Sequence, residues 1–330
     1  MPLSPSPAPG PAAQASREAA PDTPDTPGAP DAPDIPATPD IPTAPAAVRL
    51  AGPPWDLTVE PGTTVALFGP RADVTALFDR LLGLRPAAGL SVLGLPPAEA
   101  VRTAAAAGLP AGGGLPAGHT VAQVLAVAGR LGPRPADRTD LATRCGIGEL
   151  SRVRTEGLPA GGRALVRLAV ALAHTPELLV LDHPTEGLHA DDAAAFWDVV
   201  RAHRGEDRTV LLAVDDPTEA ERVADRVLVL GPDAVLADAA PGELAARVEG
   251  RLVAFESPDA ALAALRELPG VAAATGTAGQ EFRLLSTDSD STVAALHTAG
   301  LRPARLRIAA PGLAEALAPL LPADPEETPR

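Results

Sequence analysis

The chain has 330 residues, 46% of them hydrophobic, and a formal net charge of −15 at pH 7. This charge argues against a nucleic-acid-binding protein, because such proteins neutralise phosphates with clustered Lys and Arg. No apolar run approaches the ~20 residues that cross a bilayer, so we expect no membrane span. The single Cys145 cannot form an internal disulfide, which fits a reducing cytoplasm.

The chain divides by composition into four parts. Residues 1–46, rich in Pro, Ala and Asp, predict a disordered acidic tail, because they carry too few large apolar residues to offset their ordering entropy. Alternating strand and helix patterns predict a layered α/β domain over 47–247. A second alternation predicts a small α+β domain over 248–322, and 323–330 reads as a tail.

The larger domain begins with a predicted strand and turn at 57–62. Further strands are expected at 64–68, 89–95, 178–182, 209–214 and 226–230, and helices at 74–82, 98–106, 120–131, 162–174, 191–204 and 218–224, with a mostly helical stretch to about 150. In the smaller domain we expect strands at 252–255, 282–285 and 305–308, and helices at 259–268, 291–298 and 313–320.

The strand predicted at 178–182 carries the strongest functional signal. It is wholly apolar up to Asp182, and the carboxyl ends of parallel strands are where open α/β sheets bind ligands. The stretch 177–189 resembles the Walker B strand and the following loop of the ATP-binding subunits of ABC transporters. The segment 219–227 and the closing Ala-Pro-Gly-Leu-Ala-Glu-Ala-Leu at 310–317 resemble the same family, as found in bacterial drug and polysaccharide exporters.

The resemblance covers about residues 47–320. It implies a P-loop NTPase-like ABC nucleotide-binding domain with a helical subdomain, plus the small C-terminal α+β domain. It also implies ATP and Mg²⁺ as cofactors, a membrane permease as partner, and a place at the inner face of the cell membrane through that permease.

The phosphate loop departs from the family pattern of Gly, four residues and Gly-Lys-Ser/Thr. At this place the sequence reads Gly69, Pro70, Arg71, Ala72, Asp73, Val74, Thr75, Ala76. Val74 replaces the second glycine and resists a positive φ, Thr75 replaces the lysine, and Ala76 replaces the magnesium-binding hydroxyl. Lysine is absent from the whole chain.

Electrostatics at this loop disfavour a triphosphate. Asp73 adds a carboxylate, and two like charges 4 Å apart near a surface repel by about 4 kcal/mol. A helix N-terminus offers an exposed anion only ~0.3–1 kcal/mol. Arg71 either lends a positive charge to a phosphate or is a solvated loop residue. Trp55 either stacks on adenine or packs against Leu57.

Other motif positions are replaced as well. Ala111 stands where the family has its magnesium-sensing glutamine, His183 where it has the catalytic glutamate, His189 where it has an aspartate, and Asp215 where it has the switch histidine. The signature loop Leu-Ser-Gly-Gly-Gln aligns with Leu158, Pro159, Ala160, Gly161 and Gly162, or, one residue shifted, with 160–163 for Ser-Gly-Gly-Gln. Both registers lose the serine.

Two roles stay open for the retained Asp182 and its neighbour. Asp182 either makes a water-mediated magnesium contact or satisfies loop amides at the end of its strand. His183 is a candidate general base near neutral pH, and a metal site of Asp182, His183 and His189 is a further alternative.

Three hypotheses follow. The first is a pseudo-ATPase with a structural or regulatory role, without catalytic residues or a resident metal, which docks on a permease and pairs with a second, competent ATP-binding subunit. The second is a divergent but active ABC ATPase that energises export. The third is a small-molecule or protein binding module on the same fold.

Overall fold

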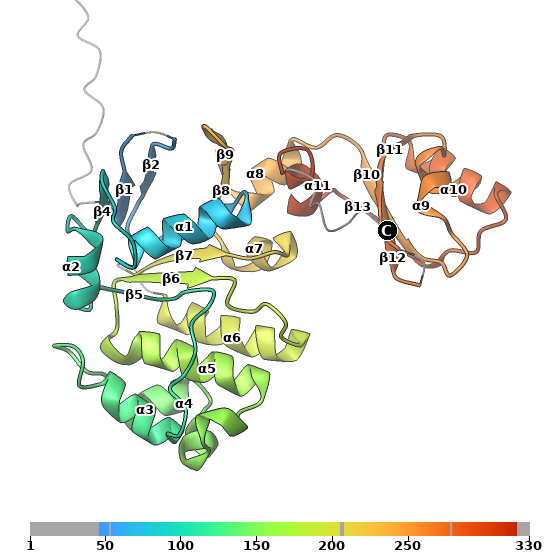
Figure 1. The fold of residues 1–330 in the computed structure, drawn as a ribbon. Coiled ribbons are helices and arrows are strands. Elements are labelled where there is room, and N and C mark those ends of the chain that lie inside the picture. The colour runs from blue at the N-terminus through green and yellow to red at the C-terminus, as the bar shows by residue number, and fades with distance from the viewer. Residues whose placement is uncertain (1–45, 53, 205–207, 278, 322–330) are drawn as a thin grey trace, which may run out of the picture. The chain divides into compact units, whose positions relative to one another are not determined.

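The computed structural model describes residues 46–52, 54–204, 208–277 and 279–321 (Figure 1). The tails predicted at 1–46 and 323–330 lie outside these residues, except for Ala46. The described elements form three sheets and the helices that pack on them. In no described part of the chain is a helix long and apolar enough to span a bilayer.

A six-stranded sheet forms the centre of the larger body. Its order is β5-β6-β7-β3-β8-β9, in which β9 alone is antiparallel to its neighbour. The strands are β3 (Thr64–Phe68), β5 (Ala106–Leu109), β6 (Leu178–Asp182), β7 (Thr209–Ala213), β8 (Arg226–Leu230) and β9 (Val235–Ala239). Every residue of β3, β6 and β7 is buried, as expected for parallel strands covered on both faces.

Helices cover both faces of this sheet. The helices are α1 (Arg71–Leu81), α2 (Pro97–Arg102), α3 (Val121–Ala128), α4 (Arg138–Arg144), α5 (Ala160–Ala171), α6 (Ala190–His203), α7 (Pro217–Val223) and α8 (Pro241–Ala246), with 3₁₀ turns η1 (Gly148–Arg152), η2 (Thr155–Gly157) and η3 (Leu172–His174). Helix α1 lies on one face, and α5 and α6 lie on the other (Figure 1). This layering supplies the hydrophobic cover that the buried strands require.

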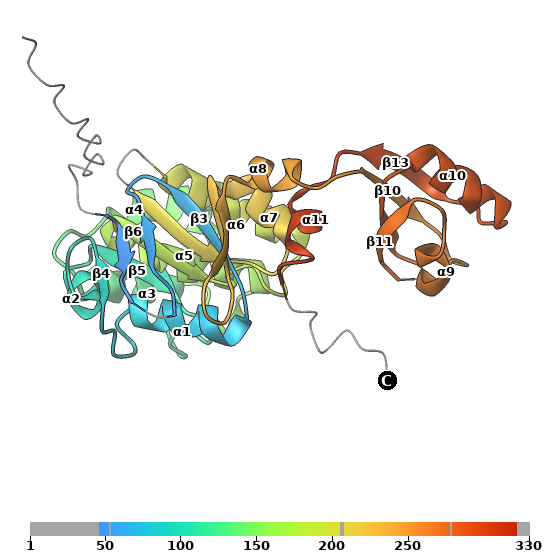
Figure 2. The same cartoon turned by 90° about the horizontal axis from the view of Figure 1, so that it is seen from above.

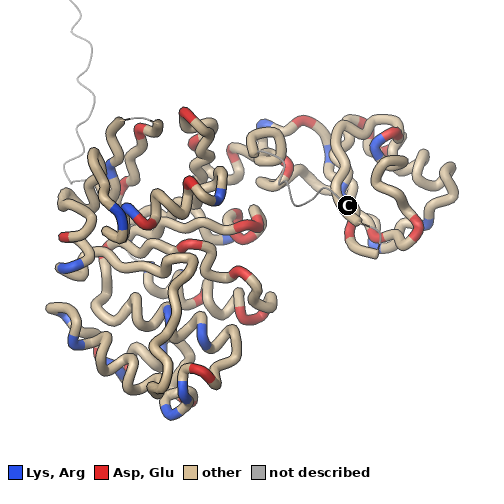
Figure 3. Tube along the Cα trace, viewed as in Figure 1, with Lys and Arg blue, Asp and Glu red and all other residues tan. Residues whose placement is uncertain are grey.

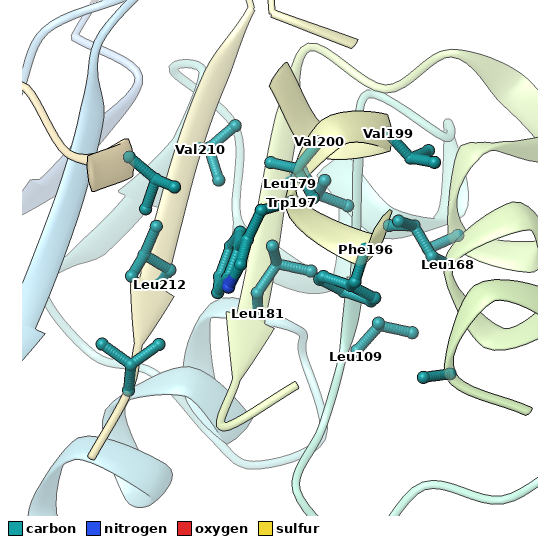
Figure 4. Packing of buried hydrophobic residues seen from close by; sticks show 14 of the residues in the cluster. Leu109, Leu168, Leu179, Leu181, Phe196, Trp197, Val199, Val200, Val210 and Leu212 are labelled. Carbon is teal, nitrogen blue, oxygen red and sulfur yellow. The ribbon is translucent and has the colours of Figure 1, made fainter. Parts of the chain in front are cut away.

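The packing under α6 shows why this layer is stable. Phe196 and Trp197 meet edge to face, with ring centroids 5.3 Å apart. Both rings belong to one buried cluster with Leu179 and Leu181 of β6, in which Phe196 lies toward Leu168 of α5 and Trp197 toward Leu212 of β7 (Figure 4). The strands that end at the candidate site are therefore held by a well-packed layer.

A second, antiparallel sheet of order β2-β1-β4 shares a buried apolar cluster with α1 and β3 of the larger body. Its strands are β1 (Val48–Leu50), β2 (Leu57–Val59) and β4 (Leu90–Val92). Trp55 is buried in the same cluster as Leu57, and its indole Nε1 donates a hydrogen bond of 2.8 Å to the carbonyl oxygen of Gly231. This burial favours the packing role of Trp55 over stacking on adenine.

The third sheet has the order β11-β12-β10-β13 and is antiparallel throughout. Its elements are β10 (Arg251–Glu256), α9 (Leu262–Arg266), β11 (Val271–Thr275), β12 (Glu281–Ser286), α10 (Ser289–Thr298) and β13 (Ala304–Ala309). Helices α9 and α10 lie on one face of it (Figures 1 and 2), and Leu265 and Leu296 pack there against Phe255 and Phe282. This sheet has a core cluster of its own.

The last described helix, α11 (Leu313–Leu317), packs on α7 and α8. Leu313 and Leu317 are buried in the large cluster beneath the central sheet. The segment predicted as a separate domain at 248–322 thus includes a helix that contributes to the core of the larger body.

The α/β class and the parallel sheet are confirmed. The structure corrects the end of the expected helix at 98–106, because Ala106–Leu109 is strand β5, paired with β6. Helices α1 and α5 also begin earlier than predicted, at Arg71 and Ala160. Strands β1, β9 and β11 and helix α8 were not predicted.

Candidate functional site at the carboxyl edge of the central sheet

Three neighbouring strands, β6, β7 and β3, deliver the predicted site residues to one edge of the sheet. Because these strands are parallel, the segments that follow them emerge side by side. Gly69 follows β3, His183 follows β6, and Asp215 lies just after β7. Figure 3 shows acidic positions gathered where this edge meets α7.

The connection between β3 and α1 is very short. Only Gly69 and Pro70 separate strand from helix. A Cβ added to Gly69 would lie 2.7 Å from the carbonyl oxygen of Leu230 on β8, so this place accepts no larger residue. Val74 is in α1 and is 2% exposed, which corrects the expectation of a conflict with positive φ at that residue.

The early start of α1 uses amides that a phosphate loop would present to its ligand. The carbonyl oxygen of Pro70 accepts from the amide of Asp73 at 2.9 Å and from that of Val74 at 3.1 Å. A phosphate cradle depends on backbone N–H groups that point at the phosphates. These two groups are instead bonded within the first turn of the helix.

Asp182 and His183 form the buried part of the site. Asp182 is 1% exposed, and its Oδ1 lies 2.7 Å from Nδ1 of His183 and 3.5 Å from Oγ1 of Thr75. Among the described residues its Oδ2 has no hydrogen-bond partner. Asp182 therefore contacts two side chains through one oxygen and leaves the other unpaired, an unusual state for a buried carboxylate.

His183 links this buried carboxylate to the exposed part of the site. Its backbone has a φ of 46°, and its Nε2 lies 3.2 Å from Oδ1 of Asp215. Each ring nitrogen thus faces a carboxylate oxygen, and both nitrogens donate only when the ring carries two protons. A positive φ is uncommon for residues other than glycine, although histidine adopts it more readily than most.

Arg71 closes the exposed part of the site. Its Nη2 donates to Oε2 of Glu186 at 2.5 Å, and its Nη1 lies 3.4 Å from both carboxylate oxygens of Asp215. The hydrogen bond to Glu186 and the charge of Asp215 raise the pKa of Arg71, so the guanidinium stays charged. The interpretation of Arg71 as a solvated loop residue missed these ion pairs, because Glu186 and Asp215 are distant in sequence.

The remaining predicted positions lie apart from this network. Ala111 is exposed in the turn after β5. Leu158 is buried and Pro159 precedes α5, whose first turn contains Ala160, Gly161 and Gly162. The α5 N-terminus has no side-chain cap, and a Cβ on Gly161 would lie 2.3 Å from the carboxylate of Asp192.

One charged residue near Ala111, Arg167, was not among the candidate site residues that the sequence suggested. Nη2 of Arg167, on α5, donates 2.9 Å to the carbonyl oxygen of Pro110, and partial burial lowers the pKa of this guanidinium. Its place in an otherwise apolar helix pattern was the available signal. Across the described ranges no cluster of three or more His, Cys, Asp or Glu side chains is placed to hold a metal ion.

Comparison with known proteins relates this arrangement to a group of transport proteins. No family model matches the chain. The daunorubicin resistance ATP-binding protein DrrA3 of Streptomyces coeruleorubidus is 32% identical over 286 residues, which cover 79% of this chain and 87% of that protein. The Nod factor export ATP-binding protein I of Neorhizobium galegae is 33% identical over 193 residues, and the match covers 56% of each chain.

Two solved structures share the fold. An ATP-binding subunit of an ABC transporter matches with a TM-score of 0.51 at 19% identity, covering 58% of this chain and 85% of its own. The cbiO1 protein of Clostridium perfringens, part of the ABC transporter complex cbiONQ, matches with a TM-score of 0.50 at 20% identity, covering 58% and 82%.

Proposed function

The chain belongs to the ATP-binding proteins of ABC transporters, and on this premise we propose that it is a subunit of an exporter that no longer hydrolyses ATP. Export is supported by the similarity to DrrA3, a resistance protein, and to the Nod factor export protein. The loss of hydrolysis is supported by the site itself.

The single observation that carries this proposal is the missing phosphate cradle. Amides of Asp73 and Val74 are bonded to Pro70, and the residue in the lysine position is Thr75. In phosphoryl transfer nearly all catalysis is positioning and charge stabilisation, and a single charged group is worth about 10³–10⁵ in rate. The simultaneous loss of the cradle, the lysine and the catalytic glutamate leaves no means of turnover.

The experiment is to measure phosphate release by the purified protein with MgATP. We expect the wild type and Asp182→Ala to release phosphate at the same background rate. We also expect calorimetry to find no ATP binding tighter than ~100 μM, a free energy of about −5.5 kcal/mol. Phosphate release that disappears in Asp182→Ala would contradict the proposal.

One observation favours the second candidate, a divergent but active ATPase. His183 stands in the place of the catalytic glutamate, and its Nδ1 is oriented by Asp182 at 2.7 Å. A carboxylate-oriented imidazole is a competent general base. In that case His183→Ala would abolish the release of phosphate, which the first candidate does not predict.

As partners we propose a membrane permease and a second, competent ATP-binding subunit, which would place the chain at the inner face of the cell membrane. Exposed apolar side chains support a docking role. Val127, in the last turn of α3, is 51% exposed, and Leu131, three residues beyond the end of that helix, is 78% exposed. Such side chains mark interaction sites when they occur together.

This docking surface is tested by co-expression with the permease subunit. We expect Leu131→Asp to reduce recovery of the permease with the tagged chain, because a carboxylate in an apolar contact is costly. Leu84→Asp, at a leucine that is 61% exposed just beyond the end of α1, serves as the matched control. Equal recovery of the permease with both variants would place its contact elsewhere.

A further inference from the structure

A single guanidinium joins the three segments that leave β3, β6 and β7. Arg71 is the first residue of α1, Glu186 lies between β6 and α6, and Asp215 lies between β7 and α7. The distances from Arg71 are 2.5 Å to Glu186 and 3.4 Å to Asp215. The sheet order places these three strands next to one another, so the ion pairs bridge the mouth of the candidate site.

The bridge continues into the buried part of the site. Asp215 Oδ1 also lies 3.2 Å from Nε2 of His183, whose Nδ1 contacts Asp182. The contacts thus run without a break from exposed Arg71 to buried Asp182. Both exposed carboxylates of this network, Glu186 and Asp215, thus face a positively charged or proton-donating group of the same protein.

This arrangement sets up a competition for Arg71. A ligand that carries phosphates needs a cation, and Arg71 is the guanidinium at the start of the helix where such a ligand would lie. To reach it, the ligand must displace both Glu186 and Asp215 and remain beside their negative charges. An exposed ion pair shifts an equilibrium by about fivefold at most, so two such pairs set an upper limit of about 25-fold, and roughly tenfold is the expected size.

We propose that Glu186 and Asp215 hold Arg71 in an autoinhibitory contact that keeps phosphate-bearing ligands away from this edge of the sheet. The inference deepens the proposed function and rests on it, because the proposed function supplies the place where a nucleotide would lie. Two carboxylates of the chain itself thus pair with the guanidinium that a phosphate group would otherwise contact. Release of those carboxylates should leave the guanidinium of Arg71 available to an anion at this edge of the sheet.

The test measures the affinity for inorganic tripolyphosphate by calorimetry at low salt. The released variant carries Glu186→Gln with Asp215→Asn in the full-length chain. We expect it to bind tripolyphosphate about tenfold more tightly than the wild type. Addition of Arg71→Ala to the released variant should remove that gain, because the guanidinium supplies the attraction.

The matched control carries Glu149→Gln with Asp233→Asn, two exposed acids that change the net charge equally. A gain in the released variant no larger than in this control overturns the inference, as does a gain that persists without Arg71. If the double variant does not fold, as judged by circular dichroism, the single variants Glu186→Gln and Asp215→Asn are compared in the same way. The two failures are distinguishable: MgATP hydrolysis that disappears in Asp182→Ala would contradict the proposed function, whereas equal gains in the released variant and the control contradict the inference alone.

Discussion

At the scale of single residues, His203 shows how burial alters a titrating group. It lies at the end of α6, 2% exposed, with Nε2 3.2 Å from the carbonyl oxygen of Pro176 and Nδ1 without a partner among the described residues. Desolvation, together with the charges of Arg208 and Arg144, lowers the pKa of His203 from 6.5 to about 4. The folded protein therefore holds this ring neutral.

We expect His203 to destabilise the fold in acid. Its pKa is lower in the folded chain than in the unfolded chain. The contribution of neutral His203 to the free energy of unfolding is therefore fully present above pH 6.5 and is lost as the pH falls toward 4. The loss approaches about 3 kcal/mol at about 1.4 kcal/mol per pKa unit. Urea unfolding between pH 7.5 and 4.5 should show a shallower pH dependence for His203→Gln than for the wild type. His297→Gln, at an exposed site, should behave as the wild type does.

Cys145 provides a second prediction at this scale. The thiol is 1% exposed, and burial raises its pKa to about 11. Since the thiolate is the reactive form, we expect no measurable labelling by Ellman's reagent in the folded protein at pH 8 and stoichiometric labelling in urea. Rapid labelling under native conditions would show that the cluster around Cys145 opens readily.

At the scale of elements, α11 has the clearest consequence. It is five residues long, too short to be stable alone, and is held by packing on α7 and α8. Leu313 is fully buried there. The end of the described chain therefore stabilises the same core that carries the candidate site.

We expect Leu313→Ala to lower the free energy of unfolding by about 2–5 kcal/mol, because it leaves a cavity in a packed cluster. Leu131→Ala, at a leucine that is 78% exposed, makes the same chemical change and should cost less than about 0.5 kcal/mol. Urea denaturation of the two variants gives the comparison. Similar losses would mean that α11 does not pack on the larger body in solution.

At the scale of the whole molecule, the apolar core is divided among separate clusters. Phe255 and Phe282 stack at 5.7 Å within the sheet of β10 to β13, whereas Phe78 lies in the cluster beneath α1. No buried side chain belongs to both of these clusters. Such clusters can open independently of one another.

We therefore expect Phe282→Ala to have a local effect, although the cost of the truncation is about 3–5 kcal/mol. Amide hydrogen exchange should accelerate in β10, β11 and β12 and stay unchanged in β6 and β7. Phe78→Ala should produce the reverse pattern. If both variants accelerate exchange everywhere, the protein unfolds as a single cooperative unit.

The sequence by itself determined the elements with a strong local signal. The apolar runs at 64–68, 178–182 and 226–230 are strands with the predicted bounds, because a strand buried on both faces needs an unbroken apolar run. It also determined that no lysine is available to any site of this chain.

The tertiary structure alone decided which contacts the residues at the carboxyl edge of the sheet make. Ala106–Leu109 is a strand only because β6 pairs with it, as its small residues carry no strand pattern. Arg71 contacts Glu186 and Asp215 across 115 and 144 residues of sequence, and only the order β6-β7-β3 brings them together. Local patterns encode periodicity and side-chain chemistry, whereas ion pairs between the ends of neighbouring strands depend on how the sheet is assembled.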